Sequence, residues 1–98
     1  MTGFSPSEKT VFLLECWFSG HVQNVGFRYQ VYQIAQGYEV AGFVKNLVDG
    51  RVWLQAEGTE NEVLKFFEEI KSHMEAFIKE VAVEKRLQLP HFEGFMIA

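Results

Sequence analysis

Apolar and polar residues alternate along residues 11–18, which predicts a β-strand with one fully apolar face and one mixed face. The apolar face consists of Phe12, Leu14, Cys16 and Phe18, and the mixed face of Val11, Leu13, Glu15 and Trp17. We expect the apolar face, with Cys16 among its residues, to belong to the packed core.

Two later segments repeat their apolar residues at helical spacing, and each predicts an amphipathic helix. The first buried stripe consists of Phe27, Val31, Ile34, Ala35 and Tyr38, and Gly37 is expected to end this helix. The second stripe consists of Val63, Phe66, Phe67, Ile70 and Met74. Thr59 and Glu62 stand at its start and predict a capping box.

Three further segments alternate as strands, over residues 39–46, 51–57 and 78–87. Asp49 and Gly50 predict a tight hairpin between the first two of them. In residues 51–57 the pattern directs Val52, Leu54 and Ala56 inward, and Arg51, Trp53, Gln55 and Glu57 outward. After a break at Pro90, residues 95–97 are expected to add a short strand at the edge of the sheet.

The order strand-helix-strand, repeated twice, predicts the α+β class and a ferredoxin-like sandwich. In this fold (βαββαβ, here with a short C-terminal strand) an antiparallel sheet carries two helices on one face. Right-handed crossovers make the first two strands point the same way, so their C-terminal ends lie at one edge of the sheet. We therefore expect Asn46, at the end of the second strand, to lie near the loop that follows the first strand.

Composition limits the partners and the compartment. The chain has 98 residues, and we expect one domain over residues 10–98 after a flexible tail over residues 1–9. The net charge of −4 argues against nucleic-acid and membrane partners, because both favour basic faces. The single cysteine cannot form an intrachain disulfide, which fits a cytoplasmic protein. Nothing in the sequence demands more than a monomer.

The residues with the clearest chemical meaning form one continuous segment, Gly20-His21-Val22-Gln23-Asn24-Val25-Gly26-Phe27-Arg28. It lies between the first strand and the first helix. A loop of small residues at a helix start presents several backbone N–H groups to one point, and such an arrangement binds anions, most often phosphate. Arg28 adds a positive charge where the helix dipole disfavours cations, which favours a functional role for it. The segment therefore predicts a phosphate-binding loop.

This loop, followed by Gly42-Phe43-Val44-Lys45-Asn46 and by Asp49-Gly50, resembles the signature of the acylphosphatase family. The terminal Gly94-Phe95-Met96-Ile97 is similar to the last strand of that family, so the resemblance covers about residues 11–98. It implies an enzyme that hydrolyses the carboxyl-phosphate bond of small acyl phosphates, giving a carboxylate and inorganic phosphate.

The resemblance also implies the role of each site residue. Arg28 would bind the phosphoryl group, and Asn46 would position the attacking water. The loop would hold the phosphoryl oxygens through the backbone N–H groups of Gln23, Asn24, Val25, Gly26 and Phe27. No cofactor and no metal ion is expected, and the three scattered histidines share no ligand spacing.

Two positions depart from the family pattern. Asn24 replaces a glycine, and asparagine is the non-glycine residue that best tolerates positive φ, so we expect the loop to keep its shape. The Asn24 side chain could still crowd the anion and change the rate, a question that the sequence leaves open. Phe43 replaces a tryptophan, which keeps an aromatic ring at that position.

Two other functions stay open at this point. A catalytically weak or inactive relative would bind anions in a regulatory role, with Asn24 as the lesion. An RNA-binding module would use Trp17 and Trp53, which the alternation places on the open face of the sheet. The acidic balance and the lack of an RNP-type segment weigh against RNA. The sequence also leaves open whether Gln23 pins the loop, and whether Lys45 adds positive potential near the site.

Overall fold

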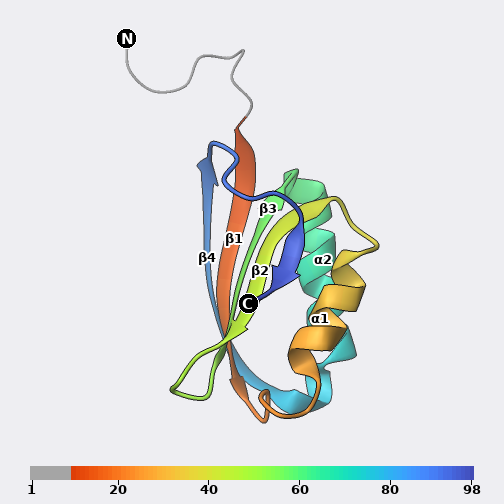
Figure 1. Cartoon of the computed structure of the whole chain (residues 1–98), viewed down its shortest axis with the longest axis vertical. Coiled ribbons are helices and arrows are strands. Elements are labelled where there is room, and N and C mark those ends of the chain that lie inside the picture. Colours follow the sequence, from red (N-terminus) through yellow and green to blue (C-terminus); the bar gives the residue numbers. More distant parts are fainter. Residues whose placement is uncertain (1–9) are drawn as a thin grey trace.

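The computed structural model describes residues 10–98, so the flexible tail predicted over residues 1–9 lies outside the described residues. The elements are β1 Val11–Gly20, α1 Phe27–Ala35, β2 Val40–Asn46, β3 Val52–Gly58, α2 Glu60–His73, the short 3-10 helix η1 Glu75–Phe77, β4 Ile78–Gln88 and β5 Phe95–Ile97 (Figure 1). Each predicted helix and strand is present in the expected order. Within residues 10–98, neither α1 nor α2 is long and apolar enough to cross a membrane.

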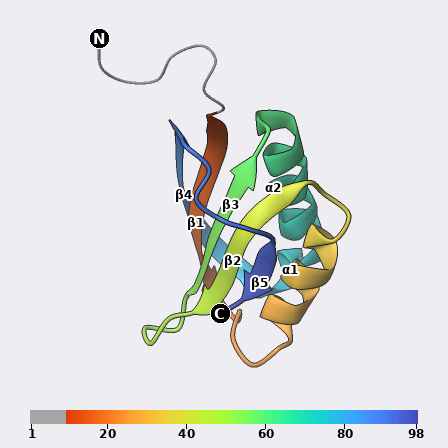
Figure 2. The ribbon, with the colours of Figure 1, turned by 45° about the horizontal axis from the view of Figure 1, so that its top comes forward.

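The strands form one sheet with the order β4-β1-β3-β2-β5. β1 pairs antiparallel with β3 and β4, and β2 pairs antiparallel with β3. β5 runs parallel to β2, so the complete sheet is mixed although its four long strands are antiparallel, as predicted. Both helices lie on one face of the sheet (Figure 2). The predicted ferredoxin-like sandwich is confirmed, and β1 and β2 end at the same edge.

The core lies between the sheet and the helices, and the predicted apolar faces supply it. Phe18 of β1, Phe27 of α1 and Phe66 of α2 are among its largest fully enclosed side chains. The ring centroids of Phe18 and Phe27 lie 5.1 Å apart, so the first residue of α1 is packed directly against β1. Cys16 is buried in the same cluster, and burial raises the pKa of its thiol well above the ordinary value. The start of α1 is therefore fixed on the sheet by packing.

Glu57 faces outward, as the alternation predicts, but it is not exposed to solvent. The residue is only 3% exposed, which its position on the outer face does not explain. The chain after β4 returns across this face of the sheet (Figure 2), and the backbone N–H groups of His91 and Phe92 donate to the Glu57 carboxylate at 3.0 and 2.9 Å. Gln88 Nε2 also donates to it, at 3.2 Å. Glu57 thus anchors the connection that leads to β5.

The predicted capping box at α2 is half formed. Thr59 Oγ1 accepts from the backbone N–H of Glu62 at 3.3 Å, as expected of an N-cap threonine. The Glu62 carboxylate does not return to Thr59, because it accepts from the backbone N–H of Glu39 at 2.8 Å. The side chain that would complete the box instead joins the start of α2 to the residue just before β2.

Candidate active site

The loop between β1 and α1 is held against the hairpin that joins β2 and β3. Gln23 Nε2 donates hydrogen bonds to the backbone oxygens of Leu47 and Arg51, at 2.8 and 2.9 Å. Leu47 and Arg51 close the turn through a 2.8 Å bond from Leu47 N to Arg51 O, and Gly50 has the positive φ of 95° that such a turn requires. Gln23 therefore pins the loop, which settles the question that the sequence left open.

Two residues of the loop have a left-handed backbone conformation, Asn24 at φ 63° and Gly26 at φ 78°. The expectation that asparagine adopts the required conformation at this position is confirmed. Gly26 is the N-cap of α1, where no side chain caps the helix and the first turn holds no acidic residue. Within residues 10–98, the backbone N–H groups from Asn24 to Arg28 donate to no acceptor. They are available to an anion, at the positive end of the helix dipole.

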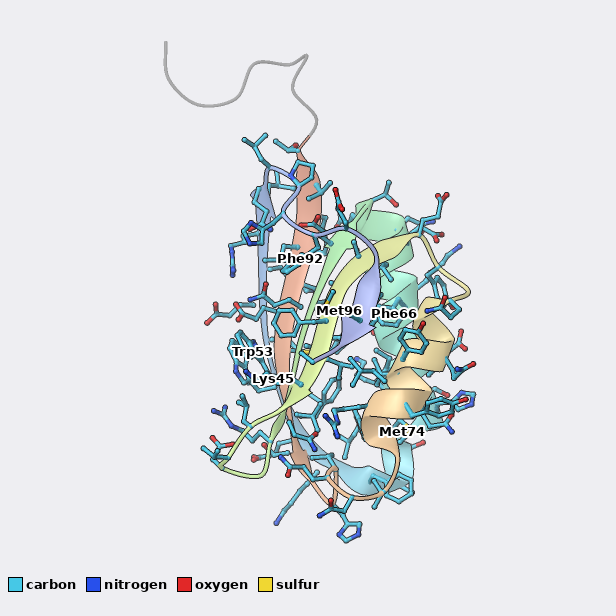
Figure 3. All side chains as sticks on the ribbon, viewed as in Figure 1. Lys45, Trp53, Phe66, Met74, Phe92 and Met96 are labelled. Atoms are coloured by element: carbon cyan, nitrogen blue, oxygen red, sulfur yellow. The ribbon has the colours of Figure 1, made fainter. Side chains whose placement is uncertain are left out.

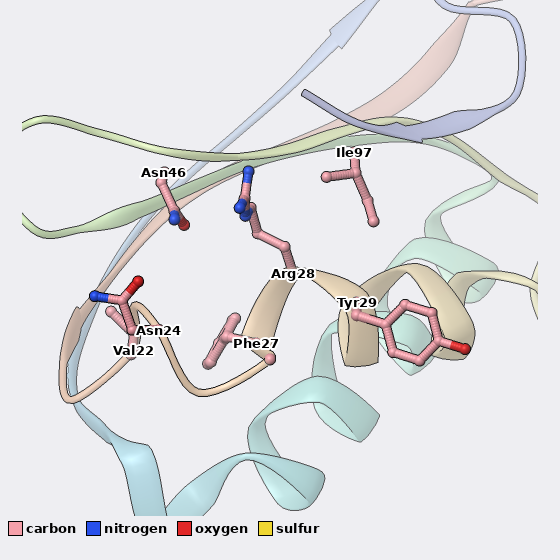
Figure 4. Close-up of a pocket in the computed structure, with 8 residues that line it drawn as sticks. Val22, Asn24, Phe27, Arg28, Tyr29, Asn46 and Ile97 are labelled. Atoms are coloured by element: carbon pink, nitrogen blue, oxygen red, sulfur yellow. The ribbon is translucent and has the colours of Figure 1, made fainter.

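A pocket of about 190 Å³ lies beside these donors (Figure 4). It is lined by Val22, Asn24, Gly26, Phe27, Arg28, Tyr29, Asn46 and Ile97. The loop, the first turn of α1, the end of β2 and the end of β5 therefore all contribute to it. Arg28 and Asn46, far apart in the sequence, line the same pocket, as the direction of β1 and β2 predicts.

Most of the predicted site residues line this pocket, namely Asn24, Gly26, Phe27, Arg28 and Asn46. Gln23 and Val25 do not: the Gln23 side chain binds the hairpin, and Val25 packs against the core. Three further residues that the sequence did not predict also line the pocket, namely Val22, Tyr29 and Ile97. Val22 and Tyr29 adjoin predicted residues in the chain, whereas no local signal places Ile97. The roles of the site residues stay predictions.

Arg28 supplies the positive charge of the pocket. Its Nη1 donates to the backbone oxygen of Ala98 at 3.1 Å, and the Ala98 N–H donates to Val44 O at 2.9 Å. These two bonds hold the guanidinium against the residue that follows β5. Within residues 10–98, no Asp or Glu side chain forms a salt bridge with Arg28. Most of its five-donor fork is free to bind a phosphoryl oxygen.

Asn46 is the last residue of β2, and Figure 4 shows its carboxamide on the same side of the sheet as Arg28. Its Oδ1 is buried and has no hydrogen-bond partner among residues 10–98. A buried acceptor without a partner costs about 1–3 kcal/mol, so this position favours a water or ligand that donates to it. Lys45, one residue earlier, does not line the pocket; it lies opposite Trp53 in the pairing with β3 (Figure 3).

No carboxylate, histidine or cysteine lines the pocket. Glu15 lies on the far face of the sheet, where burial raises its pKa but hydrogen bonds from Gln55, Trp53 and Arg86 outweigh burial and hold the pKa below its ordinary value. Among residues 10–98, no three His, Cys, Asp or Glu side chains lie close enough together to hold a metal ion. The charge available to a ligand of the pocket comes from Arg28 and the start of α1.

Trp53, one of the two tryptophans of the RNA-binding alternative, belongs to a packed aromatic cluster on the far face. Trp17 and Trp53 are cross-strand partners, and Trp53 Nε1 donates to Glu15 Oε2 at 2.8 Å. Phe43 packs edge-on against Trp53 at 4.7 Å between centroids, and Phe92 packs edge-on against Phe43 at 5.7 Å. The ring of Trp53 is thus engaged by Phe43 and by a carboxylate, and nothing in the described residues favours the RNA-binding alternative.

The fold and the pocket together define a class of protein: a ferredoxin-like α+β domain with a small polar pocket where a loop, a helix start and a strand end meet. A family model described as Acylphosphatase matches residues 14–97, nearly the whole chain. The chain belongs to the acylphosphatase family.

Individual relatives agree with this assignment. An acylphosphatase of Archaeoglobus fulgidus is 41% identical over 86 residues, which cover 87% of this chain and 96% of the relative. An acylphosphatase of Bacillus velezensis is 40% identical over 80 residues, which cover 81% of this chain and 89% of the relative. The crystal structure of acylphosphatase from Bacillus subtilis superposes with a TM-score of 0.80 at 34% identity, over 89% of this chain and 98% of that chain.

Proposed function

We propose that this protein hydrolyses the carboxyl-phosphate bond of small acyl phosphates, releasing a carboxylate and inorganic phosphate. The observation that carries the proposal is that Arg28, the free N–H groups of the loop and the unpartnered Asn46 Oδ1 all border one pocket. Membership of the acylphosphatase family supports it, as do relatives of that name which this chain matches over almost their full length.

In this proposal the phosphoryl group is bound by the loop. The backbone N–H groups from Asn24 to Phe27 donate to its oxygens, and Arg28 compensates their negative charge. Gln23 keeps the loop in place through the hairpin. Because these donors are already oriented before the substrate arrives, they stabilise the charge of the transition state without reorganising. Removing one donor from such a site typically lowers the rate by about 10²–10³-fold.

Asn46 places the attacking water. Its Oδ1 accepts a hydrogen bond from the water and holds the oxygen in line with the bond to be broken. The water oxygen forms a bond to phosphorus while the bond from phosphorus to the acyl oxygen breaks, and the acyl oxygen keeps the electron pair. The substrate R–CO–O–PO₃²⁻ and water thus yield R–COO⁻ and H₂PO₄⁻, with both water protons remaining on phosphate.

The proposed reaction requires no general acid and no general base from the protein. The leaving group is a carboxylate, which is a weak base and departs without protonation, and the phosphoryl oxygens take up the proton that the water loses. We also propose that turnover is independent of metal ions, because Arg28 and the start of α1 supply positive charge where the phosphoryl group binds.

We further propose that the protein acts as a cytoplasmic monomer on small molecules rather than on nucleic acid. The groups that the proposed mechanism uses, namely the loop, Arg28 and Asn46, border one pocket of a single chain. The net charge of −4 disfavours a polyanionic partner, and the single cysteine fits a reducing compartment.

The direct test is hydrolysis of benzoyl phosphate by the purified full-length chain, with and without EDTA. The unmodified protein should turn over the substrate equally in both conditions. Arg28→Gln should abolish turnover and inhibition by inorganic phosphate together. Arg51→Gln is the matched control, since Arg51 pairs with Asp49 on the hairpin and does not line the pocket. Folded protein without any turnover, or equal losses in both variants, would contradict the proposal.

A further inference from the structure

The pocket has two chemically different ends. Figure 4 shows Asn24 and Asn46 at one end and Tyr29 and Ile97 at the other, with Arg28 between them. We propose that Tyr29 and Ile97, here called the acyl ledge, bind the hydrocarbon of the acyl group and make aromatic acyl phosphates better substrates than acetyl phosphate. This inference rests on the proposed function and names the substrate class of the same site.

The in-line geometry of phosphoryl transfer determines on which side of the pocket the acyl group lies. In a phosphoryl transfer the attacking and leaving oxygens lie roughly in line, on opposite sides of phosphorus. The unpartnered Oδ1 of Asn46 places the water at one end of the pocket. With the phosphorus held beside Arg28, the leaving carboxylate then points to the other end, where Tyr29 and Ile97 lie. The acyl chain attached to that carboxylate therefore meets the acyl ledge.

The acyl ledge presents apolar surface that a hydrocarbon can cover. Tyr29 is 57% exposed and Ile97 is 42% exposed, so a ring and a branched side chain present uncovered apolar surface next to a polar site. No charged side chain other than Arg28 lines the pocket. A flat aromatic acyl group gains contact area with both side chains, whereas a lone methyl group gains little, because the gain grows with the apolar area removed from water.

Both members of the acyl ledge are held by regular structure rather than by a loop. Tyr29 lies in the first turn of α1, directly after Arg28. Ile97 lies on β5 and pairs with Val44 of β2, two residues before Asn46. Their positions relative to the phosphoryl site are thus set by the elements that also set Arg28 and Asn46. A fixed surface of this kind discriminates between acyl groups instead of adapting to each one.

The test compares kcat/KM for benzoyl phosphate and acetyl phosphate. Tyr29→Ala and Ile97→Ala should each lower the ratio of the benzoyl phosphate value to the acetyl phosphate value by about threefold to tenfold, as expected for losing part of an apolar contact. Tyr29→Phe should retain the preference, because the ring and not the hydroxyl makes the contact. The milder Ile97→Val should give a smaller loss in the same direction.

Two matched controls lie on the same elements but outside the pocket. Tyr32 follows Tyr29 on α1, and Met96 precedes Ile97 on β5 with 56% exposure; neither lines the pocket. Tyr32→Ala and Met96→Ala should leave the ratio of the two kcat/KM values unchanged. Equal ratios in the ledge variants and the unmodified protein would overturn the acyl ledge while leaving the proposed hydrolysis intact.

Ligand binding supplies a readout that does not need turnover. Phenylphosphonate should bind more tightly than methylphosphonate by calorimetry, and Tyr29→Ala should remove the difference. If the folded protein hydrolyses neither acyl phosphate but keeps this discrimination, the proposed function fails and the acyl ledge survives as a binding surface. If the two phosphonates bind equally well to the unmodified protein, the acyl ledge is overturned whatever the turnover.

Discussion

The side-chain nitrogen of Gln23 donates a 2.8 Å hydrogen bond to the backbone oxygen of Leu47, the residue that follows Asn46. One end of this bond lies in the loop that would hold the phosphoryl group, and the other adjoins the residue that would hold the water. The two halves of the proposed reaction are therefore joined by one side chain that does not line the pocket.

Gln23→Ala should lower both stability and kcat. The substitution removes two hydrogen bonds to backbone oxygens, and a typical bond contributes about 0.5–1.5 kcal/mol, so we expect the free energy of unfolding in urea to fall by roughly 1–3 kcal/mol. Binding of phosphate should weaken less than kcat, since the donors remain but their distance to the water position varies. Gln33→Ala, at an exposed position of α1, is the control and should change neither quantity appreciably.

Asn46→Ala should separate catalysis from binding. We expect kcat to fall by about 10²-fold or more while inorganic phosphate still inhibits, because the water loses its acceptor but the loop and Arg28 remain. Stability should change little, since the removed oxygen has no partner among residues 10–98. Steady-state kinetics and thermal unfolding measure the two effects. A variant that unfolds, or one that loses phosphate inhibition together with kcat, would assign Asn46 a structural or binding role instead.

The Asn24 position should tolerate glycine and reject β-branched residues. Asn24 has φ 63°, so Asn24→Gly keeps the conformation available and should leave the fold and the phosphate affinity within a few-fold of the unmodified protein. Asn24→Val places a branched residue in the left-handed region, which should cost about 1–3 kcal/mol of stability. Chemical denaturation checks both variants. A large rise in kcat for Asn24→Gly would show that the asparagine side chain crowds the anion.

Protonation of Glu15 should lower the free energy of unfolding at acidic pH. Its folded-state pKa lies below the ordinary value of 4.5, so the unfolded chain binds the proton more readily and the stabilisation is present above about pH 4.5. It is lost as the pH falls through the folded-state pKa. Unfolding free energies measured between pH 6 and pH 3 should therefore drop less steeply for Glu15→Gln than for the unmodified protein. Glu80→Gln, an exposed position on β4, should keep the original slope.

Much of the fold follows from local patterns, because alternation and helical spacing are properties of short segments. The faces of β1, α1 and α2 were predictable for that reason, and so was the hairpin at Asp49 and Gly50. The burial of Glu57 was not predictable, because the amides that enclose its carboxylate come from the chain after β4. The hydrogen-bond partner of the Glu62 side chain was not predictable either, because its carboxylate accepts from the backbone N–H of Glu39, which precedes β2.

The residues of the candidate site also fall into those that the sequence could place and those that it could not. Arg28 and Asn46 could be placed together, since the directions of β1 and β2 follow from the order of the elements. Ile97 could not, because an alternating pattern in a three-residue strand does not say which neighbour it pairs with or in which direction. Parallel pairing of β5 with β2 is what brings Ile97 to the pocket.

Because β5 completes one wall, the pocket requires segments that lie far apart in the sequence, from Val22 to Ile97. During synthesis or refolding, this cavity can form only when the last strand has docked on β2. Any molecule that occupies it consequently reports on complete folding, and at a concentration of 100 times its Kd it would stabilise the native state by about 2.7 kcal/mol. A ligand of the pocket would therefore stabilise a newly synthesised chain only once its folding is complete.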